Sequence, residues 1–262
     1  MTDIAIVAAV RTPIGSFRGA FAPLSAVDLG AAVVRGLLER CQLPAAAVDE
    51  LIFGQVLTAG CGQNPARQTA LRAGLPVDTP AVTVNLVCGS GLKAVQQAVQ
   101  AIRCGDAGIV IAGGQESMSN APYLMHGARD GLRFGHASLQ DSMIQDGLWD
   151  AFNDYHMANI DADAVKEAVK RHPDFIVGLK ARMSSSVVGE NGITPLARAK
   201  AIQKENGDLP LMVHIGNNPP NLDEIAELLS SGDIITHCYN GKPNRILTPS
   251  GELRASKIGR AS

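Results

Sequence analysis

The chain has 262 residues, of which 46% are hydrophobic and 18% charged, and its formal net charge is −2. This length can bury a substantial core, in one large domain or in two small ones. The near-neutral charge and the 4% aromatic content argue against a nucleic-acid-binding protein. No apolar run reaches the ~20 residues of a membrane helix, and the first residues lack a basic secretory n-region. Five cysteines without a C-x-x-C pair predict reduced thiols and a cytoplasmic protein.

Strands and helices alternate along the first 157 residues. Short apolar runs predict strands, and apolar positions at helical spacing predict the helices between them. Ser25 is a candidate N-cap, Asn64 with Pro65 begins a second helix, and Gly74 ends it. The pattern indicates a layered α/β fold. The predicted strands are 3–10, 51–56, 82–87 and 109–112, and the predicted helices are 25–40, 65–74 and a third through 92–102.

Cys88 lies where the third predicted strand ends and a helix begins, in the sequence Cys88-Gly-Ser-Gly91. The free N–H groups and the positive end of the helix dipole favour the ionised thiolate, which is the nucleophilic form. The two glycines let a bulky acyl group approach the backbone, and the N–H of Cys88 can donate to an oxyanion. The alternative is a buried structural cysteine. In this setting we favour the nucleophile, and we interpret Cys41, Cys61 and Cys104 as structural.

Five segments of the first 157 residues resemble the N-terminal half of a thiolase, the acetyl-CoA acetyltransferase group. The resemblance implies that Cys88 takes an acyl group from acyl-CoA, that His156 and Met157 lie beside the thioester and pantetheine pocket, and that the protein is a homo-oligomer. It implies no cofactor. An ordinary loop histidine is the alternative for His156. The matching segments are Ile6–Phe17 (IVAAVRTPIGSF), Gly62–Gln68 (GQNPARQ), Val84–Ala94 (VNLVCGSGLKA), Gly113–Asn120 (GGQESMSN) and Asp146–Phe152 (DGLWDAF).

The thiolase motifs that supply the rest of the reaction do not occur in this sequence. The condensation needs a base for the acetyl methyl group and oxyanion donors for two intermediates. In the family these come from a second cysteine in a Gly-rich loop, a Gly-His-Pro motif and an Asn-Glu-Ala-Phe motif. The resemblance stops after Met157, where the text continues Ala158-Asn-Ile160. We therefore expect impaired full turnover by this chain.

Residues 158–262 again predict alternating helices and strands, with strands at 175–179, 211–215 and 234–236. Three polar residues, Lys180, His214 and His237, follow or end these strands at spacings of about one β/α unit. At the carboxyl ends of barrel strands such side chains converge on one site. A lysine and two histidines in this order are typical of a site that holds a divalent metal such as zinc and activates water.

This second part resembles the amidohydrolase superfamily, near its deacetylase-like members. The resemblance implies a partial (β/α) barrel with Lys180, His214 and His237 as metal ligands. The first-strand His-x-His and a last-strand aspartate are not found, so the alternative is two buried histidines and a solvated lysine without metal. The matching segments are Val177–Met183 (VGLKARM), Pro210–Gly216 (PLMVHIG) and Thr236–Gly241 (THCYNG).

Lysine usage changes at the same point in the chain. Lys93 is the single lysine among the ten basic residues of 1–157, whereas seven of the thirteen in 158–262 are lysines. We therefore hypothesise a chimera of two domains, 1–157 and 158–262. Three functions remain open: thiolase-type acyl transfer, metal-dependent hydrolysis of an amide or ester, and a non-catalytic fragment.

Overall fold

The computed structural model describes residues 3–157, 162–238, 242–248 and 250–254. They divide into two compact units, Met1–Asp154 and Tyr155–Ser262. The predicted boundary after Met157 lies close to this division. Among the described residues, no helix combines the length and the apolar character needed to cross a membrane.

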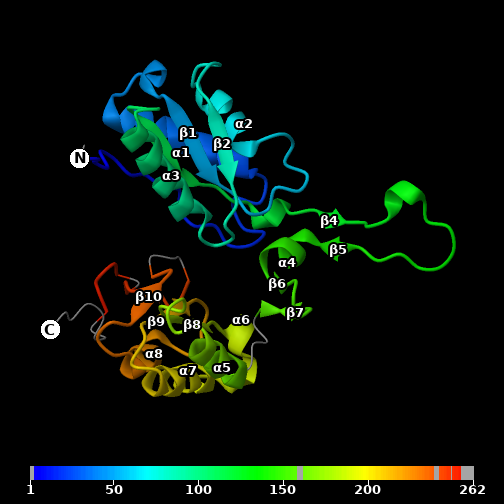
Figure 1. Ribbon diagram of the computed structural model, residues 1–262, viewed down its shortest axis with the longest axis vertical. Helices are drawn as coiled ribbons and strands as arrows, with labels where there is room; N and C mark the ends of the chain where they lie inside the picture. Colours follow the sequence, from blue (N-terminus) through cyan, green and yellow to red (C-terminus); the bar gives the residue numbers. More distant parts are fainter. Residues whose placement is uncertain (1–2, 158–161, 239–241, 249, 255–262) are drawn as a thin grey trace. The chain divides into compact units, whose positions relative to one another are not determined.

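The first unit is built around a parallel sheet of three strands in the order β2-β1-β3 (Figure 1). Side chains alternate across strand β1 (Glu50–Gly54), so that Leu51 and Phe53 face one side and Ile52 the other. Helices α1 and α2 pack on the first side, and α3 packs on the second, as expected for a buried parallel sheet. The other elements of this layer are α1 (Ala26–Cys41), α2 (Pro65–Ala73), β2 (Ala81–Val84), α3 (Ser90–Cys104), β3 (Val110–Gly114) and the short 3-10 helix η1 (Ala45–Ala47).

Local capping signals set the ends of the first two helices. The Ser25 hydroxyl accepts from the backbone N–H of Asp28, and the Asp28 carboxylate accepts from the N–H of Ser25, which completes the predicted capping box. Asn64 caps α2 through the N–H of Arg67, and Gly74 ends it in the left-handed conformation. The predicted ends of these helices are therefore confirmed.

The predicted strand at residues 3–10 is wrong. These residues form no strand in the structure, and the side chains of Ile6 and Val7 are exposed. A strand needs a neighbour for its backbone hydrogen bonds, and the described strands β1, β2 and β3 pair only with one another. The apolar composition of the segment was the only local signal, and it does not supply that neighbour.

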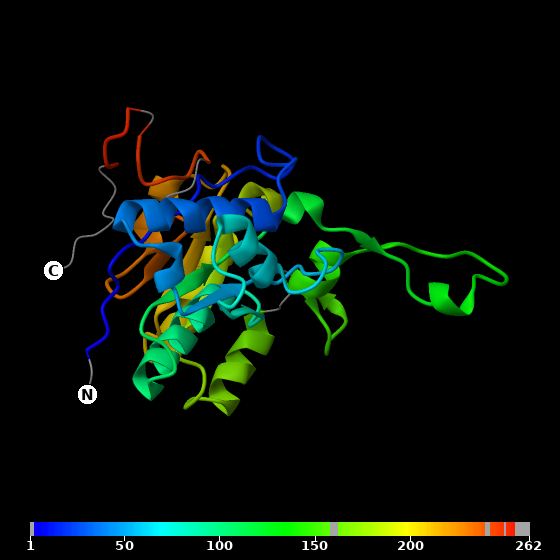
Figure 2. The ribbon, with the colours of Figure 1, turned by 90° about the horizontal axis from the view of Figure 1, so that it is seen from above.

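A long arm leaves the sheet after β3. Strand β4 (Tyr123–Leu124) pairs antiparallel with β5 (Gln140–Asp141), and the chain between them extends away from the sheet (Figures 1 and 2). The arm carries large exposed apolar side chains, among them Leu132, Phe134 and Leu139. The remaining elements here are η2 (Met118–Asn120), η3 (Ala128–Asp130), α4 (Ser142–Gly147) and β6 (Trp149–Asp150).

The second unit contains a parallel sheet in the order β10-β9-β8, with α5, α7 and α8 on one side of it (Figure 1). Its core joins Met183, Leu211 and Ile215 of the strands to Leu196 of α7 and Ile225 of α8. The described residues do not close a barrel. The elements are β7 (Tyr155–His156), α5 (Ala162–Arg171), β8 (Leu179–Met183), α6 (Ser185–Val188), η5 (Gly189–Asn191), α7 (Thr194–Glu205), β9 (Leu211–Ile215), α8 (Leu222–Leu228) and β10 (Ile234–Thr236).

Strands β9 and β10 agree with the sequence, but the predicted strand 175–179 is wrong. The strand begins at Leu179, where that prediction ends, and Phe175 and Val177 are exposed. Buried and exposed side chains alternate along β8, because one face covers the core and the other does not. In sequence, polar and apolar residues also alternate along β8, whereas the run Phe175–Leu179 before it contains no polar residue. Lys180 consequently lies near the beginning of β8 rather than beyond its end.

Candidate active site

Cys88 lies in a tight turn between β2 and α3. Val87, just before it, adopts a left-handed conformation with φ of 47°, which a β-branched residue rarely takes. The Ser90 hydroxyl holds this turn, since it accepts from the N–H of Leu86 at 2.9 Å and donates to the carbonyl of Val87 at 2.6 Å. The Cys88 side chain is exposed, not buried in an apolar interior. The turn therefore presents the thiol to solvent just before the first turn of a 15-residue helix.

Gly54, at the end of β1, allows α3 to approach the sheet closely. A Cβ at Gly54 would lie 2.5 Å from the carbonyl carbon of Ser90 and 2.7 Å from the nitrogen of Gly91. Both are backbone atoms, so no side-chain rotation can relieve the clash. The first turn of α3, and with it the Cys88 turn, is thus seated directly on the end of the central strand.

Gly54→Ala is expected to destabilise the first unit by about 1–3 kcal/mol, the usual cost of overpacking a well-packed site. The matched control is Gly36→Ala in the middle of α1, where an added Cβ meets nothing within 4 Å. Alanine there is expected to stabilise the helix by roughly 0.5–1 kcal/mol. Urea unfolding measures both variants. Equal stability of Gly54→Ala and the wild type would contradict the close seating of α3.

The loop after β1 is tied to the Cys88 turn and to the loop after β3. The Asn85 amide donates to the carbonyl of Val56 at 3.4 Å. On the other side, the Glu116 carboxylate accepts from the N–H groups of Val56 and Leu57 at 2.9 and 3.2 Å. Burial raises the pKa of Glu116 above its ordinary value, and these two hydrogen bonds oppose that rise. The carboxyl ends of all three strands are thereby connected at one edge of the sheet.

A buried amide network lies behind these loops. The Gln115 amide donates to the Gln55 side-chain oxygen at 2.9 Å, and the Thr69 hydroxyl donates to the Gln115 side-chain oxygen at 2.6 Å. The Gln55 amide also donates to the carbonyl of Leu57 at 2.9 Å. All three side chains are buried and hydrogen-bonded, which is the condition under which buried amides rigidify a core. Gln115 belongs to the sequence segment Gly113–Asn120, whose local pattern predicts no such network.

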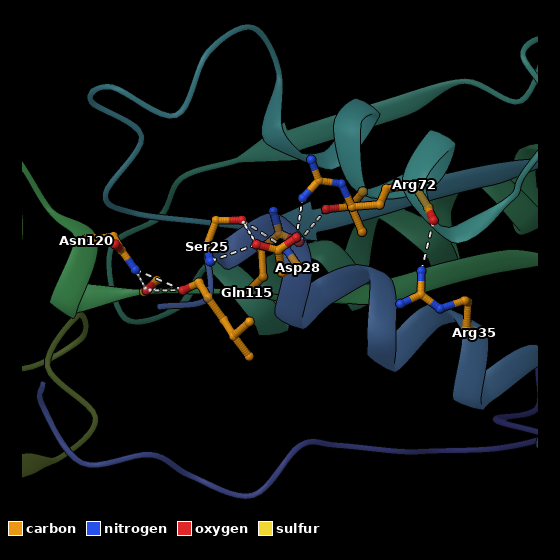
Figure 3. Close-up of polar contacts among 9 residues, drawn as sticks. Ser25, Asp28, Arg35, Arg72, Gln115 and Asn120 are labelled. Carbon is orange, nitrogen blue, oxygen red and sulfur yellow. Dashed lines mark hydrogen bonds and ion pairs between the residues drawn. The ribbon is translucent and has the colours of Figure 1, made fainter. Parts of the chain in front are cut away.

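A pocket of about 350 Å³ opens beside this network at the start of α1. Figure 3 shows Ser25, Asp28 and Arg72 turned toward one another, and Asp28 forms an ion pair with Arg72. Asn120 donates to the carbonyl of Leu24, and Arg35 donates to the carbonyl of Arg72. Cys61, predicted to be structural, lines this pocket, whereas Cys88 is not among its lining residues.

Cys88 belongs to the first unit, whereas His156 and Met157 belong to the second. His156 lies on β7 and is half-buried, and Met157 is 43% exposed. Their predicted place beside a bound thioester therefore stays a prediction.

Of the three predicted metal ligands, Lys180 lies on β8 and His214 on the neighbouring β9, and His237 directly follows β10. The rings of His214 and His237 are 4.2 Å apart between centroids. In the sheet register, however, Lys180 lies beside Met212, and Arg182 lies beside His214. Across the described part of the chain, no three His, Cys, Asp or Glu residues are grouped as a metal site. The role of Lys180, His214 and His237 as metal ligands stays a prediction.

The comparisons with known proteins match residues that lie mostly in the first unit. Residues 4–172 match the thiolase N-terminal domain family. The chain is 68% identical over 157 residues to an acetyl-CoA acetyltransferase of Pseudomonas aeruginosa, and 62% identical over 157 residues to a probable acetyl-CoA acetyltransferase of Escherichia coli. Each alignment covers 60% of this chain and 40% of the relative, so the chain spans less than half the length of the relatives it matches.

A solved structure gives the same result for the fold. The Acat5 thiolase of Ascaris suum, in complex with coenzyme A, is 42% identical with a TM-score of 0.55. The match covers 63% of this chain and 41% of that one. These comparisons support the thiolase resemblance and give no support to an amidohydrolase-like second part. Because the family match includes more than half of its residues, the chain belongs to the thiolase family.

Proposed function

We propose that this chain is a thiolase-type acyltransferase in which Cys88 accepts an acyl group from an acyl-CoA, with acetyl-CoA as the simplest substrate. The observation that carries the proposal is an exposed cysteine, held by a strained and hydrogen-bonded turn at the start of α3. The relatives named acetyl-CoA acetyltransferase support the same chemistry.

The acyl transfer takes place in two bond changes. The Cys88 sulfur attacks the thioester carbonyl carbon and forms a new carbon–sulfur bond, while the carbonyl oxygen becomes an oxyanion. In this proposal, the backbone N–H of Cys88 and the positive end of α3 stabilise that charge. The oxyanion then collapses, the bond to the coenzyme A sulfur breaks, and the proton that Cys88 has lost ends on coenzyme A. The coenzyme A thioester is the substrate, and this step needs no metal.

The sequence contains no Gly-His-Pro or Asn-Glu-Ala-Phe motif, so the proposal is limited to this half-reaction. We expect a burst of about one equivalent of free coenzyme A from acetyl-CoA, followed by little steady release and little acetoacetyl-CoA. Chromatography of acid-quenched samples separates and quantifies the two products, free coenzyme A and acetoacetyl-CoA. Absence of a burst would contradict the half-reaction, and steady formation of acetoacetyl-CoA would contradict the impairment.

Association of copies is part of the same proposal. The β4–β5 arm exposes Leu132, Phe134 and Leu139, and exposed apolar groups of this kind favour burial against another chain. We infer a homo-oligomer in the cytoplasm, where the five cysteines stay reduced. Light scattering of the purified chain tests the association, and a monomer at all concentrations would contradict it.

The assignment of residues 158–262 to a separate metallohydrolase-like domain, and the chimeric origin of the chain, are proposals of their own. They depend on the motif break and on the change in lysine usage after Met157. A long sequencing read across codons 157 and 158 in the source DNA tests the origin. A read that continues from one part into the other in one natural reading frame would contradict an assembly error. Failure to find any read that joins the two parts would support such an error.

A further inference from the structure

Glu116 is a half-buried acidic residue that the proposed acyl transfer does not use. It lies two residues after the end of β3, and each of its carboxylate oxygens accepts one hydrogen bond. The donors are the backbone N–H groups of Val56 and Leu57, at 2.9 and 3.2 Å. A carboxylate that is partly removed from water needs such donors. The side chain thereby fixes two consecutive residues of the loop that follows β1.

The same loop is connected to the turn that carries the nucleophile. The Asn85 amide donates to the carbonyl of Val56 at 3.4 Å. The side-chain oxygen of Asn85 accepts from the N–H of Val87 at 2.9 Å. One end of the Asn85 side chain therefore contacts the loop after β1, and the other end contacts the residue directly before Cys88.

Val87 is the residue whose conformation sets the direction of Cys88. Its φ of 47° is rare for a β-branched residue, so the conformation depends on the contacts around it. Asn85 holds the N–H of Val87, and the Ser90 hydroxyl donates to its carbonyl at 2.6 Å. That carbonyl belongs to the peptide bond between Val87 and Cys88. A rotation at Val87 would move the sulfur and the N–H of Cys88 together, away from the start of α3.

We propose that Glu116 is a positioning residue for Cys88, acting through the loop at Val56 and Leu57 and through the Asn85 side chain. The inference rests on the proposed function, because it concerns the same nucleophile. It adds a carboxylate from the far strand of the sheet, since β3 and β2 pair with opposite edges of β1.

Glu116→Gln is the variant that tests this role with the least change in size. A carboxylate has two acceptor oxygens, whereas an amide has one oxygen and one NH₂ group, which only donates. The glutamine can therefore accept from the N–H of Val56 or of Leu57, but its NH₂ group then faces the other N–H. The loop loses one of its two anchors, and the support of Asn85 weakens with it.

The test compares two thiols of the full chain by mass spectrometry after timed alkylation with iodoacetamide. Cys88 and Cys104 are both exposed and lie near opposite ends of α3, so Cys104 is an internal reference. We expect Glu116→Gln to lower the rate of Cys88 relative to Cys104 by roughly two- to fivefold, the scale of an anion's interaction with a helix start. The coenzyme A burst at saturating acetyl-CoA should slow by roughly tenfold or more, because transfer depends on the placement of the reacting atoms.

Asp49→Ala is the matched control. The Asp49 carboxylate also ties β1 to β3, since it accepts from the N–H groups of Gly108 and Ile109 at 2.7 and 2.9 Å. These contacts lie at the amino ends of the two strands, at the opposite edge of the sheet from Cys88. Both Cys88 rates should stay within about twofold of the wild type, as expected for a change distant from the site.

Asn85→Ala tests the connection itself and is a second variant, because Asn85 is exposed and its replacement leaves the core unchanged. It should also slow the alkylation of Cys88. Adding Glu116→Gln to Asn85→Ala should have little further effect, because two residues that act along one path are not additive. Circular dichroism confirms that each variant is folded.

Three results would overturn the proposal. They are an unchanged relative rate of Cys88 in Glu116→Gln or in Asn85→Ala, an equal loss in Asp49→Ala, and fully additive effects in the double variant. A wild type that is alkylated at Cys88 but gives no coenzyme A burst would contradict the acyl transfer instead. The alkylation rates would still decide the positioning role of Glu116 in that case.

Discussion

Cys88→Ser is expected to lower the rate of the coenzyme A burst by roughly 10³-fold or more. Removal of an enzyme nucleophile lowers rate constants on this scale. Serine keeps the size and the turn but is a much weaker nucleophile than a thiolate when no base activates it. The variant should remain folded, because the Cys88 side chain is exposed and the turn is held by Ser90. Rapid mixing with acetyl-CoA, quenching in acid and chromatography of the free coenzyme A measure the burst.

Cys104→Ser is the matched control for this prediction. Cys104 is also exposed, but it lies at the carboxyl end of the same helix, away from the N–H groups of the first turn. Its replacement should leave the burst unchanged. A burst that survives in Cys88→Ser, or that disappears in Cys104→Ser, would show that another thiol reacts.

Asp233→Asn is expected to destabilise the second unit by about 3–5 kcal/mol, because it leaves a buried ammonium without its counter-charge. The Asp233 carboxylate is fully buried and accepts from the Lys200 ammonium at 2.7 Å, from the Gln203 amide at 2.6 Å and from the N–H of Leu211 at 3.1 Å. The residue therefore joins α7 to the beginnings of β9 and β10. Hydrogen-exchange mass spectrometry of peptides from 194–236 measures the local loss of protection.

The matched control for Asp233→Asn is Glu227→Gln, which removes an exposed carboxylate on α8. Its effect on the free energy of opening, as measured by hydrogen exchange, should stay within about 0.5 kcal/mol. Equal protection in Asp233→Asn and Glu227→Gln would contradict the stabilising role of the buried pair.

The same carboxylate predicts how the second unit responds to acid. Burial raises the pKa of Asp233, but the hydrogen bonds from Lys200, Ser230, Gln203 and Leu211 outweigh this, and the pKa lies below its ordinary value of 3.8. A depressed pKa contributes stability that is present above the ordinary value and is lost as the pH falls through the folded-state value. Exchange protection of this unit should therefore fall with acidification below about pH 4 in the wild type, and less in Asp233→Asn.

Helix ends were predictable because their signals are local. Ser25 with Asp28, and Asn64 with Pro65, each cap the helix that follows them, as the sequence indicated. Such caps depend on hydrogen bonds between residues two or three positions apart, so tertiary contacts rarely change them. The turn that carries Cys88 was recognisable for the same reason, since the nucleophile, the two glycines and the helix start are adjacent in sequence.

Strand positions were less predictable because a strand depends on its neighbours. The segment 3–10 has the composition of a strand, but no described strand pairs with it. The apolar run before β8 led to the wrong prediction of a strand at 175–179. The observed strand is marked by the alternation Leu179-Lys-Ala-Arg-Met183. This shift changes the site, because it places Arg182 rather than Lys180 beside His214.

The buried polar contacts around the active-site edge could not be predicted from local pattern. Gln55 and Gln115 are 60 positions apart, and so are Val56 and Glu116. Only the parallel register of β1 and β3 brings them together, and this register is set by packing against three helices. Gln55 and Gln115 each directly follow an observed strand, β1 and β3, but the predicted strand 51–56 contained Gln55 and concealed this shared position.

The central claim is that the sulfur of Cys88 accepts the acyl group. Peptide mapping by mass spectrometry, after brief incubation of the chain with acetyl-CoA and quenching in acid, tests it most directly. We expect an acetyl group on the peptide that contains Cys88, and its removal by neutral hydroxylamine, which cleaves thioesters. An unmodified Cys88 peptide, with the acetyl group on a lysine or on no residue, would contradict the account.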